Sequence, residues 1–190
     1  MSAVRVRLIN KGYMEERLDI LDERGDKTGR SETYAEVHRS GSMHRSVHVL
    51  IVNSEGQLLL QKRASNKQAY PNCWDISAAG HISSGETSIE AAREETREEL
   101  GLDLPVVRFI FLFSIRQPII QHGEDFTDNE FNDVYLVRHD VPLSDLVLDP
   151  SEVADARWVD KSEFTSWLQS GGELVVSHHD EYRRLLENLN

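Results

Sequence analysis

The 190-residue sequence is poor in cysteine, in long apolar runs and in positive charge. The single cysteine, Cys73, excludes an intramolecular disulfide, and the first thirty residues lack the apolar core of a signal peptide. The most apolar runs, 47–52 and 109–113, are far shorter than the roughly 18 residues that a membrane-spanning helix needs. We therefore expect a cytoplasmic protein with no membrane partner.

The shortage of positive charge restricts the ligands. The chain has 21 Lys and Arg against 33 Asp and Glu, a formal net charge of −12. An acidic surface repels a phosphate backbone, so we expect no nucleic-acid partner. A small anionic molecule remains compatible with this charge if a divalent cation lies between it and the protein.

The remaining composition is that of one globular unit. Hydrophobic residues make up 39% of the chain, and 11 Gly and 5 Pro are too few for a fibrous or disordered protein. No repeat or linker divides the sequence. We expect residues 1–45 to form an N-terminal extension that starts with a hairpin over 18–29, and residues 46–190 to form the main domain. The oligomeric state stays open, a homodimer that packs through this extension included.

The pattern of strands and helices predicts an α/β fold with a mixed sheet sandwiched between helices, because no regular βαβ rhythm is present. A long polar loop is expected over 116–130. The expected strands are 47–52, 57–63, 74–77, 106–115, 131–137 and 156–159, and the expected helices are 87–100, one that starts at the Asp160-x-x-Glu163 capping signature, and one that starts near Ser177.

The predicted helix over 87–100 carries three carboxylates on one face. At about 100° per residue, Glu98 lies roughly 60° from Glu95 on one side and Glu99 roughly 40° on the other. Like charges at this spacing repel, and Mg²⁺ or Mn²⁺ would offset the repulsion. The alternative is an ordinary solvated face of a Glu-rich helix. Gly80 and Gly101 at the two ends favour a binding site, because they indicate close backbone approach beside a carboxylate platform.

These residues resemble the Nudix box, which reads Gly, five residues, Glu, seven residues, Arg-Glu, an apolar residue, any residue, Glu-Glu, any residue, Gly and an apolar residue. The sequence departs from this pattern at Glu94, where the motif has Arg, and at Thr96, where it has an apolar residue. Arg97 lies three residues after Glu94 and could neutralise it. The matching positions are Gly80, Glu86, Glu95, Glu98, Glu99, Gly101 and Leu102.

The resemblance implies a Nudix fold and hydrolysis of a diphosphate linkage in a small molecule. It implies Mg²⁺, or Mn²⁺, held by Glu95, Glu98 and Glu99 with the carbonyl of Ala79. Either Glu98 or Glu130 would be the general base, and the sequence alone leaves this choice open. Glu86 is a motif position of undetermined role.

Beyond the box, the chain resembles the branch that includes isopentenyl-diphosphate isomerases and their hydrolase relatives. In that branch an Arg and a Lys at the positions of Arg63 and Lys67 bind diphosphate. Its metal-binding histidines correspond to His44 and His81, and more loosely to His38. Acidic ligands correspond to the region of Asp128 and Glu130. We therefore expect His44 and His81 at the substrate site.

Ala79 distinguishes the two activities of this branch. The isomerases have a catalytic cysteine immediately before the Gly-His pair, and alanine cannot transfer a proton. This favours hydrolysis of a nucleoside diphosphate derivative or an isoprenoid diphosphate. An isomerase that uses another acid, and a Nudix-fold module that binds without catalysis, remain the alternatives.

Three further histidines are interpreted as structural. We expect His48 to be packed or on the surface, and His178 and His179 to be solvated at a helix start.

Overall fold

The computed structural model describes residues 5–6, 16–170 and 173–189. A seven-stranded sheet forms its centre, and β11 runs parallel to β4 whereas the other neighbouring strands are antiparallel. The strand order is β13-β5-β4-β11-β8, with β6 beside β5 and β7 beside β4. Their bounds are Val153–Val159, Leu58–Arg63, His44–Val52, Glu130–Arg138, Ile110–Arg116, Trp74–Asp75 and Ala78–His81.

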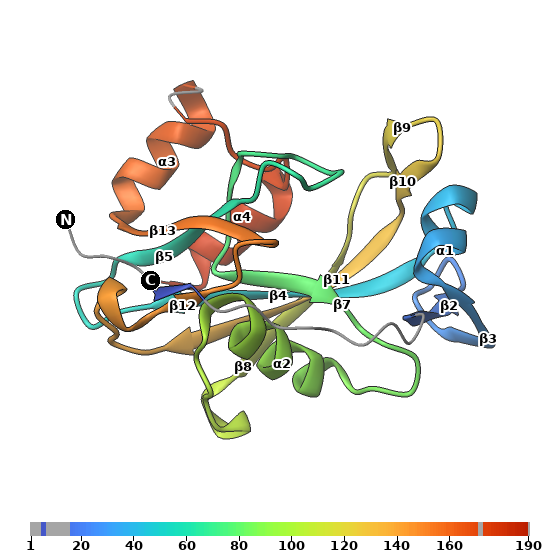
Figure 1. The fold of residues 1–190 in the computed structure, drawn as a ribbon, viewed down its shortest axis with the longest axis horizontal. Helices are drawn as coiled ribbons and strands as arrows, with labels where there is room; N and C mark the ends of the chain where they lie inside the picture. Colours follow the sequence, from blue (N-terminus) through green and yellow to red (C-terminus); the bar gives the residue numbers. More distant parts are fainter. Residues whose placement is uncertain (1–4, 7–15, 171–172, 190) are drawn as a thin grey trace.

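Helices cover both faces of this sheet (Figure 1). On one face, Val47, Val49 and Ile51 of β4 share a buried cluster with Ala91 and Ala92 of α2, Ser88–Leu100. On the opposite face, alternate residues of the same strand share a second cluster with α3, Lys161–Ser170, and α4, His179–Glu187. The alternation follows from the two-residue period of a strand. The predicted mixed sheet between helices is therefore confirmed.

The segment before the sheet contains a hairpin and an unpredicted helix. β2, Arg17–Leu21, pairs antiparallel with β3, Lys27–Thr33, where the hairpin-like start was expected. α1, Tyr34–Ser40, follows, capped by reciprocal hydrogen bonds between Thr33 and Glu36. The Thr33-x-x-Glu36 pattern is a capping box, a signal that the polar composition of this stretch obscures. The division of the chain at residue 45 stays a prediction.

The loop predicted over 116–130 is wrong in part, because it contains a two-stranded hairpin (Figure 1). β9, Ile120–Gly123, pairs with β10, Phe126–Asp128. Phe126 stacks on His38 of α1 with ring centroids 4.4 Å apart. This long-range contact, which the sequence does not reveal, joins the hairpin to α1.

The remaining elements are short. Residues 106–108, expected as strand, form the 3-10 helix η1, Val106–Arg108, and a second one, η2, spans Leu143–Asp145. β1, Arg5–Val6, runs parallel to β12, Val147–Leu148. Within the described ranges, no helix combines the length and the apolar character that crossing a membrane requires.

The end of α2 gives a test of this packing. Gly101 caps the helix with φ 73°, and a Cβ there would lie 2.6 Å from the Val147 Cβ. We expect Gly101→Ala to combine the left-handed backbone penalty of about 1–2 kcal/mol with a clash. In urea unfolding, its free-energy loss should exceed that of Gly56→Ala by at least about 1 kcal/mol. At Gly56, φ is 80° and an added Cβ would meet no atom of the described residues within 4 Å, so this position isolates the backbone term. Equal losses would contradict the clash.

Candidate active site

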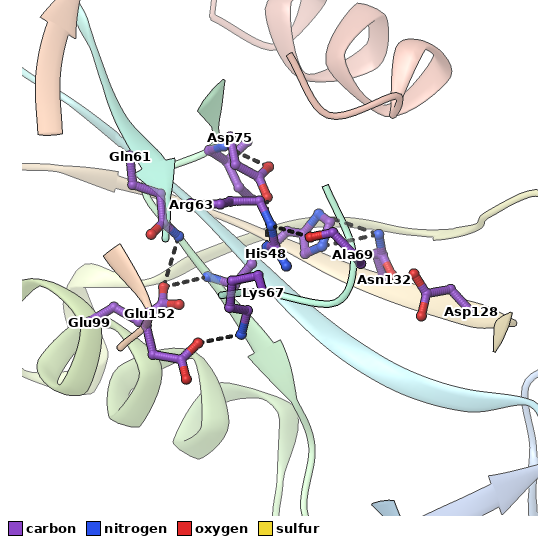
Figure 2. A network of polar contacts seen from close by, with 12 residues as sticks. His48, Gln61, Arg63, Lys67, Ala69, Asp75, Glu99, Asp128, Asn132 and Glu152 are labelled. Carbon is purple, nitrogen blue, oxygen red and sulfur yellow. Dashed lines mark hydrogen bonds and ion pairs between the residues drawn. The ribbon is translucent and has the colours of Figure 1, made fainter. Parts of the chain in front are cut away.

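A polar cavity of about 560 Å³ opens beside the C-terminal part of α2. Side chains from strands of the sheet and from loops line it. Figure 2 shows many of its polar groups. Ten of the residues that the sequence analysis proposed for the site lie in this lining: His38, Arg63, Lys67, Ala79, His81, Glu95, Glu98, Glu99, Asp128 and Glu130. The cavity therefore brings together residues that are far apart in the sequence.

Two of the three α2 carboxylates, those of Glu95 and Glu99, contact strand β7. The Glu99 carboxylate is buried and accepts hydrogen bonds from the Ala79 backbone N–H and from Gln61 Nε2, both at 2.9 Å. Burial raises the pKa of Glu99 to about 7. The Glu95 carboxylate lies against Gly80, so closely that a Cβ at Gly80 would overlap it. This close approach explains the glycine at the start of the box. The role of the Ala79 carbonyl stays a prediction.

The two residues that depart from the box, Glu94 and Thr96, do not line the cavity. Glu94 accepts hydrogen bonds from Arg97, at 3.1 Å from its Nε, so the expected neutralisation is confirmed. The same guanidinium lies 3.6 Å from Glu98 Oε1. Thr96 is buried and donates to the Ala92 carbonyl at 2.7 Å. Arg97 thus pairs with the acid that stands in place of the motif arginine, and Thr96 occupies a buried position where the motif has an apolar residue.

A second group of side chains, three of which line the same cavity, is arranged so that it could hold a metal ion. The parallel register of β4 and β11 places His44 opposite Glu130. Glu130 Oε1 lies 3.1 Å from His44 Nε2 and 3.3 Å from His81 Nε2. One ligand atom from each of His38, His44, His81 and Glu130 lies within 4.8 Å of the others. We call these four residues the histidine cluster.

The histidine cluster fits a divalent cation. His38 Nε2 is buried with no hydrogen-bond partner among the residues that the structure describes, and Asp128 Oδ1 lies 3.7 Å from it. Burial, assisted by nearby His81, lowers the pKa of His38 to about 4, so its imidazole is neutral and able to bind a metal. Burial opposes ionisation of Glu130, but hydrogen bonds from His44 and His81 hold its pKa well below the usual range. Three imidazoles and one carboxylate suit Mn²⁺, Fe²⁺ or Zn²⁺ better than Mg²⁺.

The cations expected at the diphosphate are already paired with protein acids. Arg63 donates from Nη1 to Asp75 Oδ2 at 3.3 Å and from Nε to the Ala69 carbonyl at 3.1 Å. Lys67 forms an ion pair with Glu152. The guanidinium and the ammonium both line the cavity, so each could also contact an anion there.

Two other predicted residues, His44 and Glu86, lie outside this lining, whereas Asp128 lies within it. His44 is outside the lining, and its Nε2 lies 3.1 Å from Glu130 Oε1. Glu86 lines a separate hollow of about 250 Å³ and accepts the Ser83 N–H at 3.2 Å. Asp128 accepts a hydrogen bond from His122 Nε2 at 2.7 Å, while burial and the adjacent Glu130 raise its pKa.

The sequence analysis missed a buried polar network that starts at His48 in the cavity lining. His48 is packed, one of the two readings given for it, and its Nδ1 lies 2.6 Å from Glu181 Oε1 of α4. Asn132 and Gln117 both donate to Glu181 Oε2. His178 is half-buried with Nδ1 inaccessible, so the expectation that it is solvated was wrong, while His179 is exposed as expected. His44, Ser46 and His48 occupy alternate positions of a strand, and this pattern in the sequence indicates a polar strand face.

The mixed sheet between helices, with a carboxylate-bearing helix beside a polar cavity, is the Nudix fold. A family model described as the NUDIX domain matches residues 42–177, and the chain belongs to this family. Nudix hydrolase 3 of Arabidopsis thaliana is 42% identical over 178 residues, which are 91% of this chain and 23% of the plant protein. This chain therefore corresponds to less than a quarter of that relative.

Two further comparisons cover most of both chains. Isopentenyl-diphosphate Delta-isomerase 1 of Aromatoleum aromaticum is 32% identical over 182 residues, 90% of this chain and 98% of that protein. The crystal structure of DR0079 from Deinococcus radiodurans matches with a TM-score of 0.67 at 25% identity, covering 92% of this chain and 99% of the other.

The His48–Glu181 pair predicts a pH dependence of stability. Burial opposes protonation of His48, but the Glu181 carboxylate outweighs it and raises its pKa to about 9. Because the folded pKa exceeds the unfolded value of about 6.5, this stabilisation is complete below pH 6.5 and is lost as pH rises through 9. The free energy of unfolding should fall by up to about 3 kcal/mol over that range.

Urea unfolding at pH 6.5 and pH 9.5 measures this change. Glu181→Gln is the matched variant, because it keeps the side-chain shape and removes the charge that holds the proton on His48. Its stability should change less with pH than that of the wild type. The same dependence in both proteins would assign the effect to other groups.

Proposed function

We propose that this protein hydrolyses a diphosphate linkage in a small-molecule substrate, with Mg²⁺ or Mn²⁺ as cofactor. The observation that carries the proposal is the convergence of Glu95, Glu98 and Glu99 on one cavity with Arg63 and Lys67. Three carboxylates on a rigid helix suit oxygen-ligated cations, and the two cationic side chains suit phosphate oxygens. The cavity has room for a small molecule of several hundred Å³.

The protein's own groups would position the substrate and move the proton. Bound to Glu95, Glu98 and Glu99, a divalent cation would neutralise phosphate charge and acidify a water. Arg63 is held in place by Asp75 and by the Ala69 carbonyl, so it can orient one phosphate with little loss of side-chain entropy. Lys67 would exchange its contact with Glu152 for a second phosphate oxygen.

The hydrogen bonds to Glu130 argue against Glu130 as general base, which leaves Glu98 of the two candidates. Glu130 Oε1 lies within hydrogen-bond distance of His44 and accepts from Ser46 Oγ at 3.0 Å, and His81 is 3.3 Å away. A carboxylate so stabilised in its charged form is a weak base and a good metal ligand. Glu98 lines the cavity from α2 and has one oxygen 3.6 Å from Arg97. We therefore assign proton abstraction to Glu98 and cation binding to Glu130.

Isomerisation of an isoprenoid diphosphate is the second candidate. The histidine cluster favours it, since the sequence resemblance associates these positions with the isomerase metal. Ala79, which lines the cavity, opposes it because its methyl group cannot transfer a proton to carbon. Formation of an allylic product from isopentenyl diphosphate would identify the isomerase. A cytoplasmic location and a homodimer stay predictions.

Glu98→Gln tests the assigned base. We expect turnover to fall by a factor of about 10² or more, because the amide cannot accept the proton from water. Phosphate release from a panel of diphosphates, with Mg²⁺ or Mn²⁺ and with EDTA, measures the effect. Glu90→Gln on the same helix is the control, since Gln also serves in the capping box that Glu90 forms with Thr87. Near-normal turnover by a folded Glu98→Gln protein would refute the assignment.

The histidine cluster makes a separate prediction. We expect His81→Ala to weaken Mn²⁺ binding at least about 10-fold, because it removes one of four ligands. Isothermal titration calorimetry with Mn²⁺ alone measures this without any turnover. His139→Ala, outside the cavity lining, should leave the affinity unchanged. Equal affinities in the two variants would show that the cluster does not bind Mn²⁺.

A further inference from the structure

The three carboxylates of α2 differ in their contacts with the rest of the protein. The Glu99 carboxylate accepts the Ala79 N–H at 2.9 Å, and the Glu95 carboxylate lies against Gly80, so strand β7 holds both. At about 100° per residue, Glu98 lies about 60° around the helix from Glu95 and about 100° from Glu99, at the edge of the carboxylate face. The group that orients Glu98 is therefore sought on the adjoining side of α2.

Glu94 and Arg97 occupy that side of the helix, about 40° and about 100° beyond Glu98. Arg97 donates from Nε to Glu94 Oε2 at 3.1 Å and from Nη2 to Glu94 Oε1. The same Nη2 lies 3.6 Å from Glu98 Oε1. One guanidinium therefore connects the carboxylate of Glu94 with the carboxylate of Glu98.

The two contacts with Glu94 fix the guanidinium in place. A planar fork that is bound at both oxygens of a carboxylate has a defined orientation, and little further side-chain entropy is lost when it contacts a third group. The side chains of Arg97 and Glu94 are 34% and 46% exposed, whereas that of Glu98 is 16% exposed. Exposed ion pairs add little to stability, so stabilisation of the helix is a minor effect of this pair.

The pair also compensates for the acid at residue 94. Glu94 and Glu98 are four residues apart, a spacing at which like charges on a helix repel. Arg97 contacts both and offsets this repulsion. The positive charge that the Nudix box places at residue 94 therefore lies at residue 97 in this chain, directly before Glu98.

We propose that Arg97 is a positioning residue that orients the Glu98 carboxylate toward the cavity, and that Glu94 anchors Arg97. This inference rests on the proposed diphosphate hydrolysis, in which Glu98 accepts the proton from water. Glu98 lines the cavity and Arg97 does not, so Arg97 acts through Glu98. Loss of this orientation lowers kcat and leaves KM unchanged, because a misplaced base slows the reaction without weakening substrate binding.

Arginine-to-lysine variants at two positions of α2 test the proposal. Arg97→Lys keeps the charge and removes the fork, and we expect kcat to fall about 5- to 10-fold with KM within about 2-fold of the wild type. Arg93→Lys is the matched control. Arg93 lies about 140° around the helix from Glu98 and donates to the Leu104 carbonyl at 3.0 Å. Its variant should keep kcat within about 2-fold of the wild type.

A purely structural role of the pair predicts a different result. Arg97→Lys would then lower the urea concentration at the unfolding midpoint and leave kcat unchanged. That result, in a protein that circular dichroism shows to be folded, overturns the inference. An equal fall in kcat in the Arg93→Lys and Arg97→Lys proteins also overturns it.

A charge-swapped pair tests whether Arg97 acts through Glu98. Arg97→Glu alone puts an acid beside Glu98 and should lower kcat more than Arg97→Lys does. The double variant Glu94→Arg/Arg97→Glu restores an arginine four residues before Glu98, a spacing at which helical side chains meet. Its kcat should recover to within about 3-fold of the wild type. A double variant no more active than Arg97→Glu overturns the inference.

Metal binding distinguishes failure of the inference from failure of the proposed function. If the wild-type protein releases phosphate from no compound of the panel, the proposed function fails. Isothermal titration calorimetry with Mg²⁺ alone then tests Arg97 by itself, because Glu98 is also one of the carboxylates that would bind the cation. Arg97→Lys should weaken Mg²⁺ binding at least about 5-fold, and Arg93→Lys should not. Equal affinities in the two variants overturn the inference.

Discussion

The parallel pairing of β4 with β11 is the constraint on which the site depends. Its register sets His44 beside Glu130 and Ser46 beside Asn132, so two segments 86 residues apart form one polar surface. One residue of slip would turn every polar side chain of β4 to the α2 face, into the cluster around Val47 and Val49. The apolar halves of the same strands, packed under α3 and α4, hold the register that the polar halves need.

The α2 carboxylates depend on a second constraint, which is close backbone approach. Gly80 leaves room for the Glu95 carboxylate, and the Ala79 N–H satisfies Glu99. Repulsion among three acids is thus partly offset by peptide dipoles before any cation binds. Burial nevertheless raises the pKa of Glu99 to about 7, so the apo site would carry a proton near neutral pH. A cation that binds there would displace it, which couples metal affinity to pH.

Local patterns predicted the parts of the fold that depend on neighbours in sequence. The helix from Ser88 to Leu100, its glycine end and its carboxylate face follow from spacing alone. The hairpin β9–β10 did not, because Phe126 stacks on His38 only after folding, whereas α1 was missed although its Thr33-x-x-Glu36 capping box is a local signal. Glu181 was equally inaccessible to prediction, since a carboxylate near the start of a C-terminal helix reads as a surface residue. Only the tertiary fold reveals that it is fully buried against His48.

The distribution of charge along the cavity gives the substrate a direction. Around α2 and the histidine cluster, acidic side chains outnumber the basic side chains of Arg63 and Lys67. This part of the cavity therefore needs bound metal cations to accept phosphate. Around His48 and Asp75, the charges of the His48–Glu181 and Arg63–Asp75 pairs cancel. Arg63 lines the cavity and forms an ion pair with Asp75, and it could contact a phosphate at the same time. A diphosphate ester would therefore bind with its phosphates at α2 and its organic group toward α4, because the opposite orientation would place an anion beside two buried carboxylates.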